Sequence, residues 1–228
     1  MQWNEHGDSM RPLMHRARFL FCAGLILAIT CVDLSAQEDG HISGLIASCA
    51  ACHGVDGVSV MPGAPSLGGQ NESYLLESLR ELKGENGHSA IMRGVTSDLS
   101  DNDLQQLARY FASLPYIRTP QNTDPERVAR GEKIYTRICN MCHIGGGRAA
   151  AYEEFPLLAG QSLEYMLNEV DHIMSGRRHV EITKRGMIRP LQRSELEDVV
   201  HYFASQKVTP DQVVTSRIQT GRRLKRAR

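Results

Sequence analysis

The sequence has few aromatic residues, no net charge and almost no long apolar stretch. Only 6% of its 228 residues are aromatic, and its 26 Lys and Arg residues equal its 26 Asp and Glu residues in number. Without a basic excess there is no electrostatic signal for nucleic-acid binding. The one strongly apolar run, residues 19–30, is too short to span a bilayer. These absences exclude a multi-span membrane protein and leave a globular chain.

The apolar run follows three arginines, which is typical of a signal peptide. Cleavage after residues 34–36 (LSA) would remove residues 1–36 and deliver the chain to the periplasm. Two alternatives stay open. One is a lipoprotein cut before Cys31, and the other is initiation at Met10.

Few cysteines remain once the leader is removed, and all of them lie in two identical settings. Residues 49–53 read CAACH and residues 139–143 read CNMCH, so the four cysteines are Cys49, Cys52, Cys139 and Cys142. Cys-x-x-Cys-His is the signature of c-type haem attachment. The sequence therefore predicts two covalently bound haem c groups.

The spacing of this motif suits a porphyrin. On a helix, positions i, i+3 and i+4 share a face, so two thiols can reach neighbouring vinyl groups while His53 or His143 meets the iron. A zinc site usually separates its Cys-x-x-Cys pairs by 15 to 20 residues, whereas 86 residues separate these pairs. A thioredoxin-type dithiol needs a βαβ setting, and no strand pattern surrounds either pair. A small disulfide scaffold would not place histidine after both pairs.

The chain contains a tandem repeat. Residues 65–70 (PSLGGQ) match 156–161 (PLLAGQ), and the segment YFAS occurs at 110–113 and 202–205. The repeat predicts an all-α fold of two small domains. The expected organisation is a signal peptide (1–36), a first domain (37–116), a linker (117–124), a second domain (125–206) and a basic, disordered tail (207–228).

Apolar residues at helical spacing predict the buried faces of four helices. The expected stripes are Leu75, Leu79 and Leu82; Met166, Val170 and Ile173; Leu104, Leu107, Ala108 and Phe111; and Leu196, Val199, Val200 and Phe203. Because such small domains have limited cores, we expect the haem groups to complete them.

Capping signals predict where three helices begin. Ser100 with Asp103 and Ser194 with Glu197 fit capping boxes for the last helix of each half. Asp124, followed by proline, fits the N-cap of the helix that carries the second haem motif.

A second axial ligand must lie far enough along the chain to wrap around the haem. Met92 and Met187 meet this condition, 39 and 44 residues after the motif histidine of their half, and a thioether raises the reduction potential. His88 and His179 stay open as alternatives, as does an open iron position. Met174 is expected to pack in the core.

Each motif histidine should also bind a fixed acceptor through its second ring nitrogen. The carbonyl groups of Pro65 and Pro156 are the candidates, since these prolines follow His53 and His143 by 12 and 13 residues. The alternative is that the prolines only start turns.

With these motifs the sequence resembles the dihaem cytochrome c4 family of class I cytochromes c. Within that group it is similar to the cytochrome subunit of flavocytochrome c sulfide dehydrogenase, through residues 89–92 (SAIM), 142–147 (CHIGGG) and 153–154 (EE). The resemblance implies two class I domains related by pseudo-twofold symmetry, with the ligand pairs His53/Met92 and His143/Met187 and single-electron transfer as the function.

The family pattern of a glycine and an aromatic residue before the first cysteine is met by Gly131 and Tyr135. His41 and Leu45 occupy the corresponding places in the first half and depart from it.

Charge is unevenly distributed. Residues 37–116 hold 10 acidic and 4 basic residues, whereas 206–228 hold 1 acidic and 7 basic. The acidic half could steer a basic redox partner, or it could be an ordinary solvated surface. For the tail, binding to anionic lipid or to an acidic partner is the alternative to disorder.

The expected function is electron transfer as the subunit or partner of a flavoprotein dehydrogenase that oxidises sulfide. The alternatives are a free shuttle to a terminal oxidase or reductase and, third, a dihaem peroxidase. An electron carrier needs no catalytic acid, base or nucleophile, so none is assigned.

Overall fold

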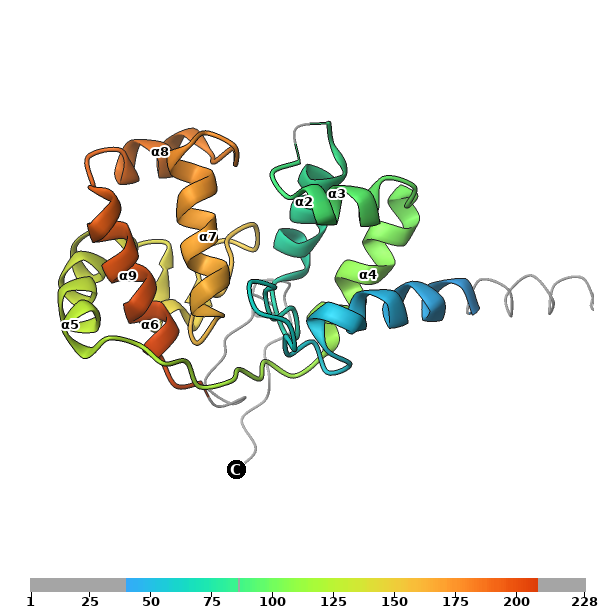
Figure 1. Cartoon of the computed structure of the whole chain (residues 1–228), viewed down its shortest axis with the longest axis horizontal. Helices are drawn as coiled ribbons and strands as arrows, with labels where there is room; N and C mark the ends of the chain where they lie inside the picture. Colours follow the sequence, from blue (N-terminus) through green and yellow to red (C-terminus); the bar gives the residue numbers. More distant parts are fainter. Residues whose placement is uncertain (1–39, 86, 209–228) are drawn as a thin grey trace, which may run out of the picture. The chain divides into compact units, whose positions relative to one another are not determined.

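The structure is a computed structural model that describes residues 40–85 and 87–208 (Figure 1). The expected signal peptide, and the tail beyond residue 208, lie outside the described residues. The chain divides into one unit of residues 1–44 and a second of residues 45–228. Of the first unit only residues 40–44 are described, and they are helical.

Helix is almost the only regular secondary structure in the described part, as the repeat predicts. Its first half contains helical residues 45–53, then α2 (Glu72–Lys83), α3 (Ala90–Thr96) and α4 (Asp101–Ser113). Its second half contains α5 (Pro125–Ile134), the π-helical segment η1 (Tyr135–Cys139), α6 (Ile144–Gly147), α7 (Leu163–Met174), α8 (Ile182–Ile188) and α9 (Arg193–Ser205). A two-residue strand, β1 (Ala149–Ala150), pairs with residues 143–144.

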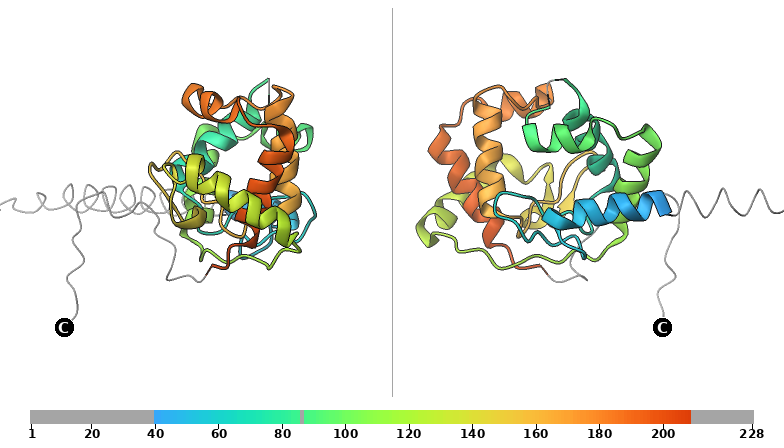
Figure 2. Two further views of the ribbon diagram at one scale, coloured as in Figure 1. Left: turned by 90° about the vertical axis from the view of Figure 1, so that its left-hand side faces the viewer. Right: turned by 45° about the vertical axis from the view of Figure 1, so that its right-hand side comes forward.

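Packing follows the repeat. In the first half α4 and α3 both pack on α2, and in the second half α9 packs on α5 and α7 (Figure 2). Residues 115–124 between the halves carry neither helix nor strand (Figure 1). This agrees with an extended connection containing two prolines.

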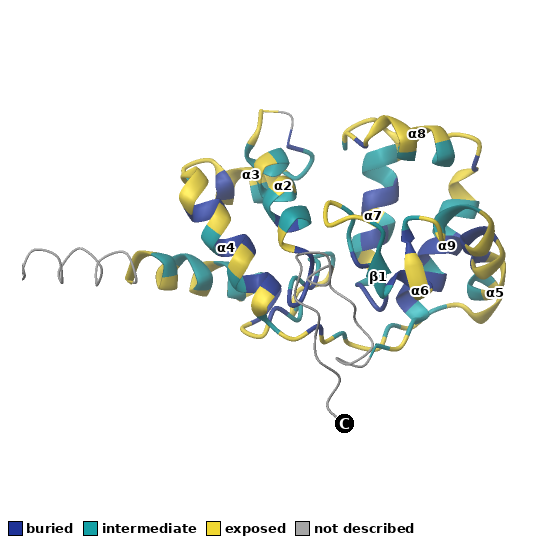
Figure 3. Ribbon diagram, turned by 180° about the vertical axis from the view of Figure 1, so that it is seen from behind, coloured by how far each residue is buried: buried dark blue, intermediate teal, exposed yellow. Residues whose placement is uncertain are grey.

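Every residue of the predicted apolar stripes is buried or half-buried, and Figure 3 shows how buried and exposed positions alternate along the helices. Leu104, Leu107 and Phe111 of α4 are at most 3% exposed, and Met166 and Val170 of α7 are at most 6% exposed. The prediction for Met174 is wrong, because its side chain is 48% exposed. It is the last residue of α7, where the helix has already passed beyond the packed interface.

Two of the three predicted helix starts are confirmed. Ser100 caps α4, and its own backbone N–H donates to the Asp103 carboxylate at 2.8 Å. Asp124 caps α5, accepting from the backbone of Glu126 at 2.8 Å and of Arg127 at 3.3 Å. Each carboxylate thus binds amide groups that the helix itself leaves without partners.

The start predicted for α9 at Ser194 is wrong. The helix begins at Arg193, and the backbone N–H of Gln192 donates to Glu195 at 2.8 Å, so the cap lies two residues earlier. Glu197, the expected capping partner, instead accepts hydrogen bonds from Arg127 and Arg193, both at 3.0 Å.

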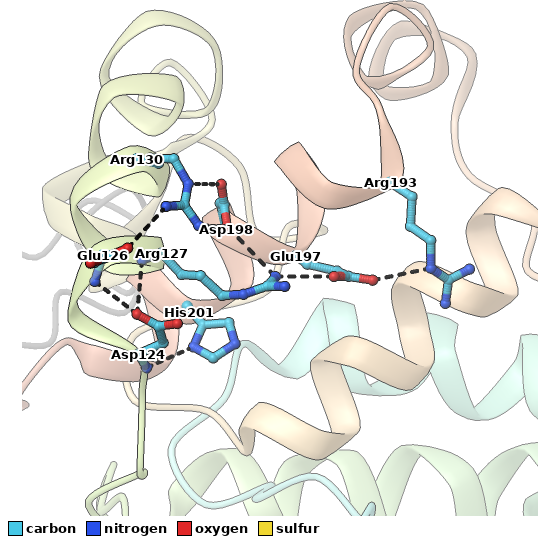
Figure 4. Close-up of polar contacts among 8 residues, drawn as sticks. All are labelled: Asp124, Glu126, Arg127, Arg130, Arg193, Glu197, Asp198 and His201. Carbon is cyan, nitrogen blue, oxygen red and sulfur yellow. Dashed lines mark hydrogen bonds and ion pairs between the residues drawn. The ribbon is translucent and has the colours of Figure 1, made fainter.

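Helices α5 and α9 cross at a glycine. A methyl group on Gly131 would lie 2.0 Å from the carbonyl oxygen of Asp198, so no larger residue fits without separating the helices. Beside the crossing, Arg130 donates two hydrogen bonds to the Asp198 carboxylate, at 2.7 and 3.1 Å (Figure 4). The Asp124 backbone N–H also donates to His201 Nδ1 at 3.1 Å. The close approach and the ion pair together fix α5 against α9.

We predict that Gly131→Ala destabilises the haem-loaded protein by about 1–3 kcal/mol, because the added methyl group overpacks this crossing. Thermal unfolding followed by circular dichroism measures the effect. Gly94→Ala in α3 is the matched control, since nothing lies within 4 Å of its added methyl group. It should leave the stability unchanged or raise it by at most about 1 kcal/mol. Equal effects of the two substitutions would contradict the crossing.

Candidate haem sites

The two Cys-x-x-Cys-His motifs have different backbones. Residues 49–53 are helical, so the predicted helical display is correct in the first half. In the second half that expectation is wrong, because α5 gives way to η1 and residues 140–142 form a turn. The Asn140 N–H donates to the Tyr135 carbonyl at 3.0 Å, a bond between residues five apart that widens the last turn before Cys142.

Tyr135 holds this turn in place. Its hydroxyl donates to Asn140 Oδ1 at 2.6 Å and accepts from the Gly146 N–H at 2.7 Å. Its ring stacks on Tyr202 of α9, with 4.7 Å between centroids. The aromatic residue four positions before Cys139 was visible in the sequence. Its role as a hydrogen-bond centre was not, because that role depends on the glycine turn after the motif.

Both motif histidines are buried and bound to a proline carbonyl, as predicted. His53 Nδ1 lies 2.8 Å from the Pro65 oxygen, and His143 Nδ1 lies 3.1 Å from the Pro156 oxygen. A carbonyl can only accept, so Nδ1 carries the proton and Nε2 keeps a free lone pair. In each half, Nε2 is thus the nitrogen available to a metal.

The surroundings keep these imidazoles neutral. Burial lowers the pKa of His53, although the Pro65 carbonyl opposes this effect. Burial, with the positive charge of Lys184, lowers the pKa of His143 to about 4. Neutral imidazole is the form that binds iron.

The second motif opens on an apolar cavity of about 190 Å³. Cys139, Cys142 and His143 line it, and so does Met187, the predicted second ligand. Most of the remaining lining comes from aliphatic and aromatic side chains of η1, α7, α8 and α9. A partly open apolar cavity with two thiols, an imidazole and a thioether has the donor set and the polarity that a porphyrin requires.

Besides the cysteines and His143, five lining residues of the cavity carry a polar or charged group: Tyr74, Tyr165, Glu169, Arg178 and Lys184. Arg178 and Lys184 suit the carboxylate groups of a haem, since Arg and Lys pair with such anions. Glu169 carries the opposite charge and pairs with Arg178. Tyr74 belongs to α2 of the first half, so the second cavity is completed by the first half.

The second ligand expected in the first half is Met92. Met92 lies in α3, partly buried, and its backbone N–H donates to Ser89 Oγ at 3.3 Å. Its position opposite His53 stays a prediction. The alternatives have other contacts: His88 binds carboxylates, and the exposed His179 lies 3.2 Å from Arg185.

A cluster of charges that the sequence did not reveal joins the two halves beside the cavity. His88 Nε2 lies 3.4 Å from Glu169 of α7, and His88 Nδ1 lies 3.6 Å from Glu81 of α2. Arg178 pairs with Glu169 and lies 3.3 Å from the Tyr74 hydroxyl. No motif marks this cluster, because its members come from separate elements.

Electrostatics favour a protonated His88. Burial lowers the pKa of His88, but the Glu169 and Glu81 carboxylates outweigh burial and raise it to about 9. For Glu169, burial raises the pKa, and the neighbouring His88 and Arg178 outweigh it and lower the value to about 2. At neutral pH the cluster is therefore held by opposite charges.

We predict that the free energy of unfolding falls by about 1–2 kcal/mol as the pH rises from 6.5 to about 9. The sign follows from the raised pKa of His88: its stabilisation is complete below the ordinary value of 6.5 and is lost as the pH passes about 9. His88→Gln should remove this dependence, and urea unfolding of the haem-loaded protein measures it.

The groups that face His88 are Glu81, Glu169, His172 and Arg178. The matched control is His179→Gln, which replaces an exposed histidine and should keep the alkaline loss. An equally steep loss in His88→Gln would contradict the assignment.

Comparison with known proteins identifies the family. Residues 43–115 and 128–207 each match the cytochrome c family. Cytochrome c4 of Stutzerimonas stutzeri is 31% identical over 199 residues, which span 78% of this chain and 94% of that protein. This chain belongs to the dihaem cytochrome c4 family. The cytochrome thus carries two covalently bound haem c groups and is an electron carrier rather than an enzyme.

Two further proteins are similar to this chain. The crystal structure of reduced recombinant cytochrome c4 from Pseudomonas stutzeri superposes with a TM-score of 0.65 at 30% identity, covering 74% of this chain and 98% of that one. A thiosulfate dehydrogenase electron acceptor of Thiomonas intermedia strain K12 is 32% identical over 142 residues, which span 58% of this chain and 65% of that protein. Among the described helices of the cytochrome, none has the length and apolar character needed to cross a bilayer.

Proposed function

We propose that His53 with Met92 and His143 with Met187 bind the two irons, and that Cys49, Cys52, Cys139 and Cys142 form the thioether bonds. The observation that carries this proposal is the second cavity, which brings Cys139, Cys142, His143 and Met187 to one apolar space. The bond from each histidine to a proline carbonyl supports ligation through Nε2.

Haem supplies a one-electron couple when bound. The protein supplies its axial ligands, the polarity of its surroundings and the charges near its carboxylates. His143 and Met187 would fill both axial positions, which suits electron transfer and disfavours a peroxidase, since that reaction needs an open position. The mostly apolar lining of the cavity would give the haem a surrounding of low polarity, and Arg178 and Lys184 offer positive charge to haem carboxylates.

The partner we propose is a dehydrogenase of inorganic sulfur compounds, with the cytochrome accepting its electrons in the periplasm. Likeness to a thiosulfate dehydrogenase electron acceptor supports a sulfur-oxidising partner. A flavoprotein sulfide dehydrogenase, which the sequence resemblance favours, belongs to the same chemical class. The alternative is a free shuttle that delivers electrons to a terminal oxidase or reductase.

Replacing each methionine should remove the thioether signature of one haem only. In Met92→Ala and in Met187→Ala we expect half of the absorption band of methionine-ligated ferric haem to disappear, because one of two irons loses its sulfur ligand. Visible spectroscopy of the ferric protein and its proton NMR spectrum measure this loss.

Met61→Ala and Met174→Ala are the matched controls, since both residues are about half exposed in the structure. Loss of the band in either control, or its full retention in a test variant, would contradict the ligand assignment.

For the partner, we predict that thiosulfate dehydrogenase with thiosulfate reduces the oxidised cytochrome, and that the second-order rate falls as salt rises. The acidic first half would attract a basic docking face on the dehydrogenase, and salt would screen this attraction. Glu77→Gln with Asp98→Asn, two exposed positions there, should lower the rate by about 2-fold to 10-fold at low salt. Stopped-flow absorbance measures it.

The matched control neutralises two exposed acids of the second half, Glu132 and Glu154. It should change the rate less than the first-half pair does. The flavoprotein subunit of a sulfide dehydrogenase, supplied with sulfide, is the alternative electron donor. If it reduces the cytochrome and thiosulfate dehydrogenase does not, the sulfide enzyme is the partner. Reduction by neither would favour the free shuttle.

A further inference from the structure

The two halves exchange a symmetrical set of glutamine hydrogen bonds. Gln161 of the second half accepts from the Ser66 N–H at 2.9 Å and donates to the Ser66 carbonyl at 2.8 Å. Gln70 of the first half accepts from the Leu157 N–H at 2.8 Å and donates to the Leu157 carbonyl at 2.9 Å. Both glutamine side chains are buried, with 3% exposure. Each half thus forms two hydrogen bonds to one backbone residue of the other half.

Ser66 and Leu157, the residues that the glutamines bind, directly follow Pro65 and Pro156. The carbonyl groups of these prolines bind the motif histidines. The carbonyl of Pro65 and the N–H of Ser66 belong to one planar peptide group. The carbonyl side of that group binds His53 Nδ1 at 2.8 Å, while the N–H side binds Gln161. One rigid amide therefore connects a histidine of the first half with a glutamine of the second.

The second half repeats this arrangement with the roles exchanged. The peptide group between Pro156 and Leu157 binds His143 Nδ1 at 3.1 Å through its carbonyl and Gln70 through its N–H. Hydrogen bonds in such a chain polarise one another, so an amide whose N–H is bound becomes a better acceptor at its carbonyl. Each glutamine can therefore strengthen the bond to a histidine that it does not touch.

The local backbone fixes both glutamines. Each follows a glycine with positive φ, 67° at Gly69 and 65° at Gly160, a conformation that other residues rarely adopt. These glycines donate their N–H to the carbonyl groups of Phe111 and Phe203 in the last helix of their own half, at 2.9 and 2.8 Å. The glutamine oxygen also accepts the next N–H of its own chain, at 3.0 Å for Gln70 and 2.9 Å for Gln161.

We propose that Gln70 and Gln161 are positioning residues acting across the repeat: Gln161 tunes the haem bound by His53, and Gln70 tunes the haem bound by His143. We call each path from glutamine through the amide to the histidine a crossed relay. This inference rests on the proposed ligation by His53 and His143.

The direction of the effect follows from the relay. A stronger acceptor at Nδ1–H makes the imidazole a more basic ligand, and a more basic ligand favours ferric iron. Removing the glutamine should weaken that acceptor and raise the reduction potential of the haem in the opposite half. A purely structural role would loosen both halves or affect the glutamine's own half.

The experiment compares Gln70→Met and Gln161→Met in the haem-loaded, full-length protein. Methionine keeps the length of the side chain and removes its hydrogen bonds. Spectroelectrochemistry measures both potentials, and Met92→Ala and Met187→Ala reference spectra assign each potential to its haem. We expect the ferric-to-ferrous ratio of the opposite haem at fixed potential to change roughly fivefold, which is about 40 mV for a one-electron couple.

Gln121→Met is the matched control. Gln121 also accepts a backbone N–H of the second half, from Leu163 at 3.1 Å, but it touches neither proline peptide. It should leave both potentials unchanged. Should a methionine variant fail to fold, Gln70→Glu and Gln161→Glu keep the accepting oxygen and, when ionised, accept more strongly. These variants should lower the potential of the opposite haem more than that of their own.

Equal shifts at both haems, or a larger shift in the glutamine's own half, would overturn the crossed relay. If the glutamine variants with such shifts kept the low-spin spectrum of methionine-ligated haem at both irons, the proposed ligation would stand. Failure of the proposed ligation would be recognised separately. In that case Met92→Ala and Met187→Ala would have the same visible spectrum as the unsubstituted protein.

Discussion

The bond between a histidine Nδ1 and a proline carbonyl is the constraint on which the rest of the structure depends. It decides which ring nitrogen carries the proton, and so it leaves the other nitrogen free to meet a metal. The two bonds, from His53 to Pro65 and from His143 to Pro156, are repeated over nearly equal chain distances. The glutamines, the positive-φ glycines and the last helix of each half all serve to hold these carbonyl groups.

The two halves repeat the fold without repeating every detail. Asn71 follows Gln70 and sends its side chain across to the Phe155 carbonyl at 2.7 Å, whereas Ser162, its counterpart, caps α7 by accepting from Tyr165. The second motif begins at the last residue of a π-helical segment and continues through a turn, whereas the first lies on a regular helix. The two haem environments of this electron carrier therefore differ although their motifs are the same.

Most of the fold could be predicted because its signals are local. The stripes of α4 and α9, the caps at Ser100 and Asp124 and the proline acceptors follow from residue spacing alone. What could not be predicted depends on partners distant in the sequence. Glu197, the expected capping partner in α9, instead accepts from Arg127 of α5, and the turn at Cys139 depends on Tyr135 bonding a glycine beyond the motif. The charge cluster around Glu169 draws on both halves, so no single stretch of sequence could show it.

The exchanged glutamine bonds have the form of an isologous contact, in which the same surface meets itself about a twofold axis. Two separate copies of one half would offer each other these same donors and acceptors, so the contact does not require a fused chain. Joining the copies through residues 115–124 turns a concentration-dependent homodimer into an intramolecular pair. Once fused, each copy is free to change alone, and the divergence of Asn71 from Ser162 is the kind of difference that duplication permits.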